Sequence, residues 1–275
     1  MHEIRIGGLE LQNPIMPASG TFGFGYELAD RLPISKLGAI VTKAVTLRPR
    51  QGNPPPRAQE TPCGMLNSVG LENPGLEGFF SEILPKIRGL GPPIVVNIAG
   101  ERTSDYLALA EALDSAEGVS ALEVNVSCPN VEGGTEFGRN HEALEGLVRE
   151  LRTRTQKHLW VKLTPFLTDV ISEAKAAERG GAEALVVANT YKGLWIRDDG
   201  SEFVGGLSGP AIMPLSLFLV REVSKEVSIP VIGVGGIRNA SDVRRYLKAG
   251  AVAVQVGTGN LVDPARMFRI IEELS

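Results

Sequence analysis

The stretch Pro230-Val231-Ile232-Gly233-Val234-Gly235-Gly236 is an apolar run that ends in two glycines. The later stretch Ala251-Val252-Ala253-Val254-Gln255-Val256-Gly257-Thr258 repeats this pattern. Short runs rich in Val and Ile are typical of strands that are buried on both faces of a parallel sheet. Between the two runs, Ser241–Lys248 has the period of an amphipathic helix. The region therefore predicts a strand–helix–strand unit of an α/β protein.

Six apolar runs of the same kind precede these two, at Ile15–Pro17, Ala39–Thr42, Pro93–Ile98, Ala121–Val126, Leu159–Leu163 and Ala184–Val187. Stretches of helical period separate most of them, the clearest being Asp105–Leu113, Glu142–Arg152, Asp169–Glu178 and Ile212–Glu226. Eight strands that alternate with helices favour a (β/α)8 TIM barrel over an open doubly wound sheet, which usually has about five or six strands. We expect one barrel domain over residues 1–275, with a hairpin of Ile4–Ile6 and Leu9–Gln12 at the barrel bottom.

The composition of the chain excludes several classes of protein. Its 275 residues include 28 basic and 32 acidic residues, a balance that argues against a non-specific nucleic-acid binder. Only Cys63 and Cys128 are present, too few for a disulfide-rich scaffold, a four-thiolate zinc site or a cysteine-ligated iron–sulfur cluster. No apolar run approaches the ~20 residues of a membrane helix, and the first residues lack a signal-peptide pattern. We expect a cytoplasmic protein with no metal and no membrane partner.

Polar residues and glycines stand at the carboxyl ends of the eight predicted strands, in the order Ser19, Lys43, Asn97, Asn125, Lys162, Asn189, Gly235-Gly236 and Gly257-Thr258. Barrels bind and react at this face because their eight βα loops meet there. A lysine at the end of an apolar strand is costly unless it has an anionic partner. The set therefore predicts a site for a large polar ring.

Glycines after the last two strands predict a phosphate site. Gly235-Gly236 and Gly257 let backbone N–H groups approach a phosphate closely, and barrels commonly bind phosphate in these two loops. The alternative is that these glycines only form tight turns.

The stretch Asn125-Val126-Ser127-Cys128-Pro129-Asn130 leaves the fourth strand and continues into a Gly-rich segment, 131–138, that could act as a lid. Cys128 is either a small buried apolar residue or a reactive thiol. None of the three histidines is placed to serve as its base, so general-base duty falls to Cys128 or to a lysine. Residues 61–75 are interpreted as a turn-rich loop over the barrel, and Cys63 as structural.

Seven motifs resemble those of the dihydroorotate dehydrogenase family: Ser19-Gly20-Thr21-Phe22-Gly23-Phe24-Gly25, Thr42-Lys43-Ala44-Val45, Gly64-Met65-Leu66-Asn67-Ser68-Val69-Gly70-Leu71, Asn125-Val126-Ser127-Cys128-Pro129-Asn130, Asn189-Thr190, Gly205-Gly206-Leu207-Ser208-Gly209-Pro210 and Gly235-Gly236. The resemblance implies an FMN-containing barrel that oxidises (S)-dihydroorotate to orotate in pyrimidine biosynthesis. Cysteine at position 128 resembles the soluble class 1 enzymes, and the first and third motifs resemble the class 1B catalytic subunit more than the fumarate-linked class 1A enzyme. Cys63, where a serine is expected, and Trp195-Ile196-Arg197 depart from the family pattern.

The resemblance also implies residue roles. Cys128 would take a proton from C5 of dihydroorotate while a hydride leaves C6 for N5 of the flavin, and Lys162 would lie near the flavin N1–C2 edge. Residues implied to hold the substrate are Lys43, Asn67, Ser68, Val69, Gly70, Leu71, Asn125, Asn130, Asn189 and Thr190. Residues implied to contact FMN are Ser19, Lys43, Ala44, Asn97, Asn125, Lys162, Ala188, Gly209, Gly235, Gly236, Gly257 and Thr258.

The class 1B resemblance implies a partner chain. That chain would carry FAD and a 2Fe–2S cluster and pass electrons to NAD, with a homodimer of this chain inside a heterotetramer. Within the resemblance, a fumarate-linked class 1A-type enzyme is the alternative. From the residues, two further alternatives stay open: a Schiff-base aldolase that uses Lys162, and a non-catalytic barrel that serves as a binding or scaffold subunit.

Overall fold

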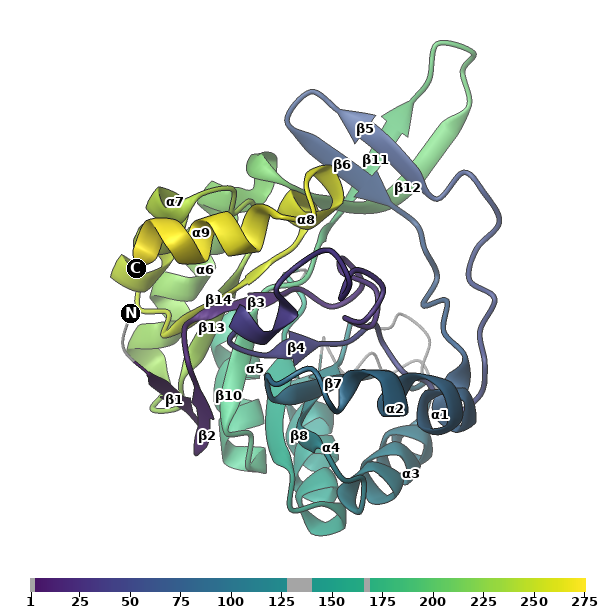
Figure 1. The fold of residues 1–275 in the computed structure, drawn as a ribbon. Helices are drawn as coiled ribbons and strands as arrows, with labels where there is room; N and C mark the ends of the chain where they lie inside the picture. Colours follow the sequence, from purple (N-terminus) through teal and green to yellow (C-terminus); the bar gives the residue numbers. More distant parts are fainter. Residues whose placement is uncertain (1–2, 128–139, 166–168) are drawn as a thin grey trace.

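The computed structural model describes residues 3–127, 140–165 and 169–275. Its central sheet has eight parallel strands: β3 (Ile15–Pro17), β4 (Ile40–Val41), β7 (Ile94–Ile98), β8 (Val119–Asn125), β9 (His158–Lys162), β10 (Ala184–Val187), β13 (Val231–Val234) and β14 (Ala253–Val256). Their spatial order is β3-β14-β13-β10-β9-β8-β7-β4. The two end strands approach each other where Gly38 N donates to Ile15 O over 2.8 Å. The predicted eight strands and the TIM barrel are confirmed (Figure 1).

Helices pack around this sheet and match the predicted amphipathic stretches to within a few residues. The longer ones are α3 (Thr103–Asp114), α4 (His141–Arg154), α5 (Val170–Gly180), α6 (Met213–Glu226), α7 (Ala240–Lys248) and α9 (Arg266–Leu274). Shorter helical segments are Ile34–Lys36, α1 (Gly75–Gly78), Phe79–Ile83, α2 (Leu84–Ile87), Pro210–Ile212 and α8 (Thr258–Val262). The Asp169 carboxylate caps α5 by accepting from Ile171 N and Ser172 N, and Gly181 ends that helix in the left-handed conformation.

The chain begins with the predicted hairpin, β1 (Ile4–Ile6) and β2 (Leu9–Leu11), which closes the barrel bottom. Ile6 and Leu11 are buried among the side chains that fill the barrel. A Cβ atom on Gly8 would lie 3.0 Å from the ring of His158, the first residue of β9, so the turn presses against the amino ends of the barrel strands.

The barrel interior changes from apolar to polar along four of the strands, β7, β8, β9 and β14. Val95, Ala121, Trp160 and Ala253 belong to the buried apolar cluster inside the barrel. Side chains two positions apart on a strand lie on the same face. Two positions further along, the same strands carry Asn97, Glu123, Lys162 and Gln255, all of them buried. A polar layer therefore lies above the apolar filling, toward the carboxyl ends of the strands.

A four-stranded antiparallel sheet was not predicted. It consists of β5 (Ala58–Thr61), β6 (Gly64–Asn67), β11 (Tyr191–Ile196) and β12 (Glu202–Ser208), in the order β11-β12-β6-β5. It extends beyond one end of the barrel (Figure 1). The interpretation of residues 61–75 as a loop is therefore wrong for β6. The Cys63 thiol is exposed in the turn before β6, and its backbone oxygen accepts a hydrogen bond from Ala211 N.

Candidate active site

A cavity of about 620 Å³ lies at the carboxyl ends of the barrel strands. Residues that follow β3, β4, β10, β13 and β14 line it, and so do Asn125 of β8 and Lys162 of β9. Met65 and Asn67 of β6, together with residues 69–72, form another part of its wall. Its volume is in the range of about 300–1,000 Å³ that is usual for ligand pockets.

Seventeen of the predicted site residues line this cavity: Ser19, Lys43, Ala44, Asn67, Val69, Gly70, Leu71, Asn125, Lys162, Ala188, Asn189, Thr190, Gly209, Gly235, Gly236, Gly257 and Thr258. Ser68 does not line it; its hydroxyl accepts from Asn53 Nδ2 instead. Asn97 is completely buried in the polar layer of the barrel. Cys128 and Asn130 lie outside the described residues.

Lys162 and Glu123 form a buried ion pair at the base of the cavity. Lys162 Nζ is 3.5 Å from Glu123 Oε1 and 3.4 Å from Gln255 Oε1. The Lys162 side chain is 6% exposed and that of Glu123 is completely buried. Because this ammonium has an anionic partner, the cost of holding it at the end of an apolar strand is offset.

Asn97 supplies a buried acceptor in the same layer. Its Nδ2 donates to Glu123 Oε1 over 2.7 Å. Its Oδ1 has no hydrogen-bond partner among the residues that the structure describes. A buried oxygen of this kind can accept a hydrogen bond from a polar ligand, which would remove the cost of leaving it unpaired.

Two cations and one carboxylate meet at another part of the cavity wall. Glu72 Oε2 is 3.0 Å from Arg57 Nη1 and 3.7 Å from Lys43 Nζ. All three residues line the cavity. The cations are therefore balanced by a carboxylate of the protein itself, and an anionic ligand here would meet both attraction and repulsion.

Two asparagines, Asn125 at the end of β8 and Asn189 just after β10, are held by hydrogen bonds. Asn125 Oδ1 accepts from Ser127 N, and Asn189 Nδ2 donates to Ser127 Oγ over 3.0 Å. Asn189 Oδ1 accepts from Thr190 N over 2.8 Å, and Tyr106 Oη donates to the backbone oxygen of Asn125. These bonds fix the orientation of the amides, and such fixed polar groups can select a ligand with a matching hydrogen-bonding edge.

The turn after β13 has a geometry that depends on glycine, whereas Gly257 after β14 has a φ of -103° and room for a Cβ atom. Gly235 and Gly236 have φ angles of +129° and +69°. A Cβ atom on Gly236 would lie 2.6 Å from Met213 Cβ and 2.9 Å from Gly209 O. The backbone therefore follows a path next to the cavity that a larger residue could not take without a shift.

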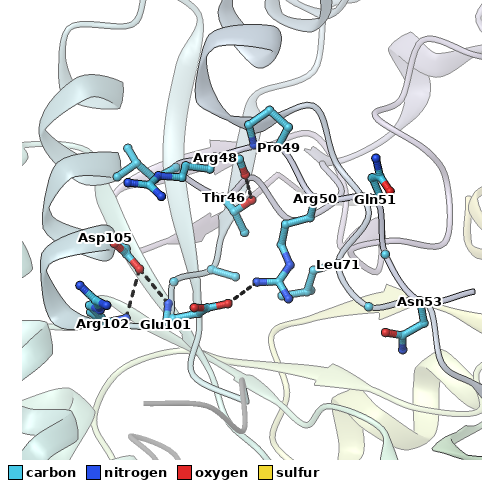
Figure 2. Close-up of a pocket in the computed structure, with 15 residues that line it drawn as sticks. Thr46, Arg48, Pro49, Arg50, Gln51, Asn53, Leu71, Glu101, Arg102 and Asp105 are labelled. Atoms are coloured by element: carbon cyan, nitrogen blue, oxygen red, sulfur yellow. Dashed lines mark hydrogen bonds and ion pairs between the residues drawn. The ribbon is translucent and has the colours of Figure 1, made fainter. Parts of the chain in front are cut away.

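A thin wall separates this cavity from a second one of about 570 Å³. Figure 2 shows residues that line the second cavity. Gly70 and Leu71 line both cavities, and Leu71 has a φ of +57°, which is uncommon for a residue with a side chain. Buried Asn73 holds the wall: its Nδ2 donates to Leu71 O, and its Oδ1 accepts from Thr46 N and Gly75 N. In the second cavity, Arg50 Nη1 pairs with Glu101 over 2.6 Å.

Away from the cavity, α5 carries a buried glutamate, Glu173. Burial, reinforced by the nearby Asp169 carboxylate, raises the pKa of Glu173 from 4.5 to about 7. Its Oε2 has no hydrogen-bond partner within the described part of the chain. This carboxyl therefore affects the pH dependence of stability without lining the site.

Within residues 3–127, 140–165 and 169–275, no group of three or more His, Cys, Asp or Glu side chains could hold a metal ion. None of the helices in these ranges is long and apolar enough to cross a membrane.

A closed barrel with a buried lysine, fixed amides and glycine turns around one cavity defines an enzyme of the (β/α)8-barrel class. Residues 1–275 match the family model for dihydroorotate dehydrogenase. The chain belongs to the dihydroorotate dehydrogenase family and is an oxidoreductase, which confirms the resemblance of its motifs.

Curated relatives are similar over nearly the whole chain. A protein of Thermoanaerobacter pseudethanolicus named dihydroorotate dehydrogenase B (NAD(+)), catalytic subunit, is 48% identical, over 98% of this chain and 91% of that protein. Proteins of the same name from Carboxydothermus hydrogenoformans and Bacillus mycoides are 47% and 46% identical, over 99% of this chain and 91% and 90% of those proteins. The chain is therefore most similar to class 1B catalytic subunits.

Among the residues at the site that received no role from the sequence are Arg57, Glu72, Glu123 and Gln255. Glu123 and Gln255 did carry a signal, because each is a polar residue inside an apolar strand run and lies on the face that points into the barrel. Arg57 and Glu72 carried no such signal in the sequence, because the contact between them depends on how residues 50–75 fold.

Proposed function

We propose that this chain uses FMN to oxidise (S)-dihydroorotate to orotate in pyrimidine biosynthesis. The observation that carries the proposal is the cavity itself, which combines the buried Lys162 ammonium, the Asn125 and Asn189 amides and the Gly235-Gly236 turn. Membership of the dihydroorotate dehydrogenase family supports this reaction, and the cavity provides polar groups of the kind that the reaction needs.

The residues present fit FMN. The Gly235-Gly236 and Gly257-Thr258 turns line the cavity and suit a phosphate. Asn97 Oδ1, in the polar layer beneath the cavity, is a buried acceptor without a hydrogen-bond partner among the described residues. Ser19, Lys43, Ala44, Ala188 and Gly209 complete the proposed cofactor contacts. When bound, FMN supplies the acceptor for the hydride. Lys162 supplies a fixed cation beside the ring, where reduction places negative charge.

The substrate is proposed to lie between the amides and the wall. Asn67, Asn125, Asn189 and Thr190 would hydrogen-bond the ring and carboxylate, and Lys43 would contact the carboxylate. Leu71 and its neighbours would contribute backbone groups. Cys128 and Asn130, outside the described residues, are proposed as the general base at C5 and as a further substrate contact.

The Schiff-base alternative is less well supported. An amine that attacks a carbonyl must be uncharged, whereas Lys162 lies against the Glu123 carboxylate. The proposed dehydrogenase instead needs a lysine that stays cationic.

Electrons are proposed to pass from this chain to NAD through a partner subunit with FAD and a 2Fe–2S cluster. Two observations support this: the relatives are named catalytic subunits of an NAD(+)-linked enzyme, and two cysteines cannot ligate such a cluster here. The chain is also proposed to form a homodimer within that complex and to be cytoplasmic.

The test is a purification followed by assays. The chain is expected to retain about one FMN per protomer and to form orotate from dihydroorotate with an artificial electron acceptor. NAD reduction is expected only when the partner subunit is added, and fumarate is expected to be a poor acceptor. A colourless protein with no orotate formation would contradict the dehydrogenase function. Efficient fumarate reduction by the isolated chain would contradict the class 1B assignment, and light scattering of the isolated chain tests the dimer.

A further inference from the structure

Glu123 is a charged residue in the interior of the barrel. Its side chain is completely buried on β8, two positions after Ala121, which belongs to the apolar filling. A buried ion pair is rarely more stable than apolar side chains of similar volume, because desolvation costs as much as the attraction returns. The location of Glu123 therefore calls for a role other than packing.

Both carboxylate oxygens of Glu123 are held. Oε1 accepts from Asn97 Nδ2 over 2.7 Å, and Oε2 accepts from Gln255 Nε2. These neighbours come from strands on either side of the barrel interior, β7 and β14. The carboxylate consequently has little freedom to rotate or move.

The same groups hold the ammonium of Lys162. Nζ lies 3.5 Å from Glu123 Oε1 and 3.4 Å from Gln255 Oε1, so Gln255 bonds to both members of the ion pair. Of these groups, only Lys162 lines the cavity. The network thus presents one fixed cation to the ligand and places its counter-charge behind it.

We propose that Glu123 is a positioning residue for Lys162: it holds the ammonium at the base of the cavity and offsets part of its charge. This inference rests on the proposed function in so far as the ligand beside Lys162 is the flavin. The Glu123 carboxylate partly compensates the positive charge of Lys162, so Lys162 exerts a weaker electric field on a bound ring. Removal of the carboxylate charge would strengthen that field and favour the reduced, negatively charged flavin.

The first test uses apoprotein and needs no flavin. Glu123→Gln and Lys162→Met each leave one buried charge without its partner, and each is expected to lower the melting temperature by about 6–10 °C. The double variant has neither charge and is expected to lose much less than the sum of the two. If the double variant lost as much melting temperature as the two single variants together, the proposed pairing of Glu123 with Lys162 would be overturned. If Glu123→Gln fails to fold while the double variant folds, the coupling is supported; if neither folds, the charge pair does not explain the loss and the proposal fails.

The second test measures the reduction potential of bound FMN by equilibration with a reference dye. Glu123→Gln is expected to shift the potential to more positive values, and Lys162→Met to more negative values. Glu173→Gln, measured at pH 8 where that carboxyl is mostly ionised, removes a buried charge away from the cavity; it is the matched control and should leave the potential unchanged. An unchanged or more negative potential in Glu123→Gln would overturn the proposed charge compensation. A wild-type chain that binds no FMN would contradict the proposed function, while the apoprotein result would still decide the pairing.

Discussion

Arg57 and Glu72 form an ion pair at the cavity wall, with Nη1 and Oε2 3.0 Å apart, and the same oxygen is 3.7 Å from Lys43 Nζ. A carboxylate of the protein thus lies against the cations that face the cavity. The proposed substrate is itself a carboxylate, so it competes with Glu72 for Lys43. Glu72 therefore limits the affinity for anionic ligands.

We predict that Glu72→Gln binds orotate about three- to tenfold more tightly at low salt, because one repulsive charge is removed. The gain should shrink as salt is added. Calorimetric titration of the FMN-loaded protein with orotate measures the effect. Glu77→Gln, an exposed neutralisation in the following helix α1, is the control and should leave the affinity unchanged. Weaker binding by Glu72→Gln would mean that Glu72 orients Arg57 rather than competing with the ligand.

Glu173 gives a prediction about stability and pH. Its pKa is about 7 in the folded protein against 4.5 as the ordinary value, so the folded state retains a proton that the unfolded chain releases. The stability that this retained proton confers is fully present below about pH 4.5, declines between about pH 4.5 and pH 7, and is absent above pH 7. The whole decline amounts to about 3 kcal/mol of unfolding free energy. Glu173→Gln should abolish this decline.

Chemical denaturation of both proteins at pH 5 and pH 8 measures the difference. The unfolding free energy of Glu173→Gln relative to wild type should rise by about 2–3 kcal/mol between these pH values. Glu150→Gln, which changes an exposed side chain on α4, should show no such change. The same pH dependence in wild type and Glu173→Gln would disprove the assignment.

Gly236→Ala is predicted to lower the affinity for FMN at least about tenfold. Gly236 has a φ of +69°, and a Cβ atom there would lie 2.6 Å from Met213 Cβ, so the turn must move. Fluorescence titration of apoprotein with FMN measures the loss. At Gly89 a Cβ atom would meet no other atom within 4 Å, so Gly89→Ala is the control. Equal affinity in the two variants would exclude this turn from the cofactor site.

Cys128→Ser is predicted to lose most of its turnover at neutral pH and to regain part of it at high pH. A hydroxyl releases its proton much less readily than a thiol and is the weaker general base. The pH profile of dihydroorotate oxidation tests this. Cys63→Ser changes the exposed thiol before β6 and should leave the profile unaltered. Equal profiles for Cys128→Ser and wild type would remove Cys128 from the reaction.

The barrel could be predicted from the sequence because its strands are continuous apolar runs. β7 and β10, for example, are buried at every position, and such runs have few alternatives. The antiparallel sheet over the cavity could not be predicted in this way. β6 and β12 contain glycines and polar residues, which are typical of turns, and they pair across 139 positions of sequence between Asn67 and Gly206. Such pairing depends on the barrel that brings the two segments together.

The site was predictable where a residue stands at a strand end, as Lys43 and Lys162 do. The hydrogen bonds between polar side chains deeper in the barrel were not predictable, although these residues stand out as polar positions within apolar strand runs. Glu123 and Gln255 are examples, because their partners come from strands far apart in the sequence. Asn97 was predicted to contact the cofactor, but in the structure it is buried below the cavity: its amide nitrogen bonds to Glu123, and its oxygen has no hydrogen-bond partner among the described residues.

The proposed function requires this chain itself to transfer a hydride from dihydroorotate to bound FMN. The most direct test is anaerobic mixing of the isolated, FMN-loaded chain with (S)-dihydroorotate, with no other electron acceptor. We predict loss of the visible absorbance of the oxidised flavin and formation of one orotate for each flavin reduced. Unchanged absorbance and no orotate, in a protein that carries its full complement of FMN, would contradict it.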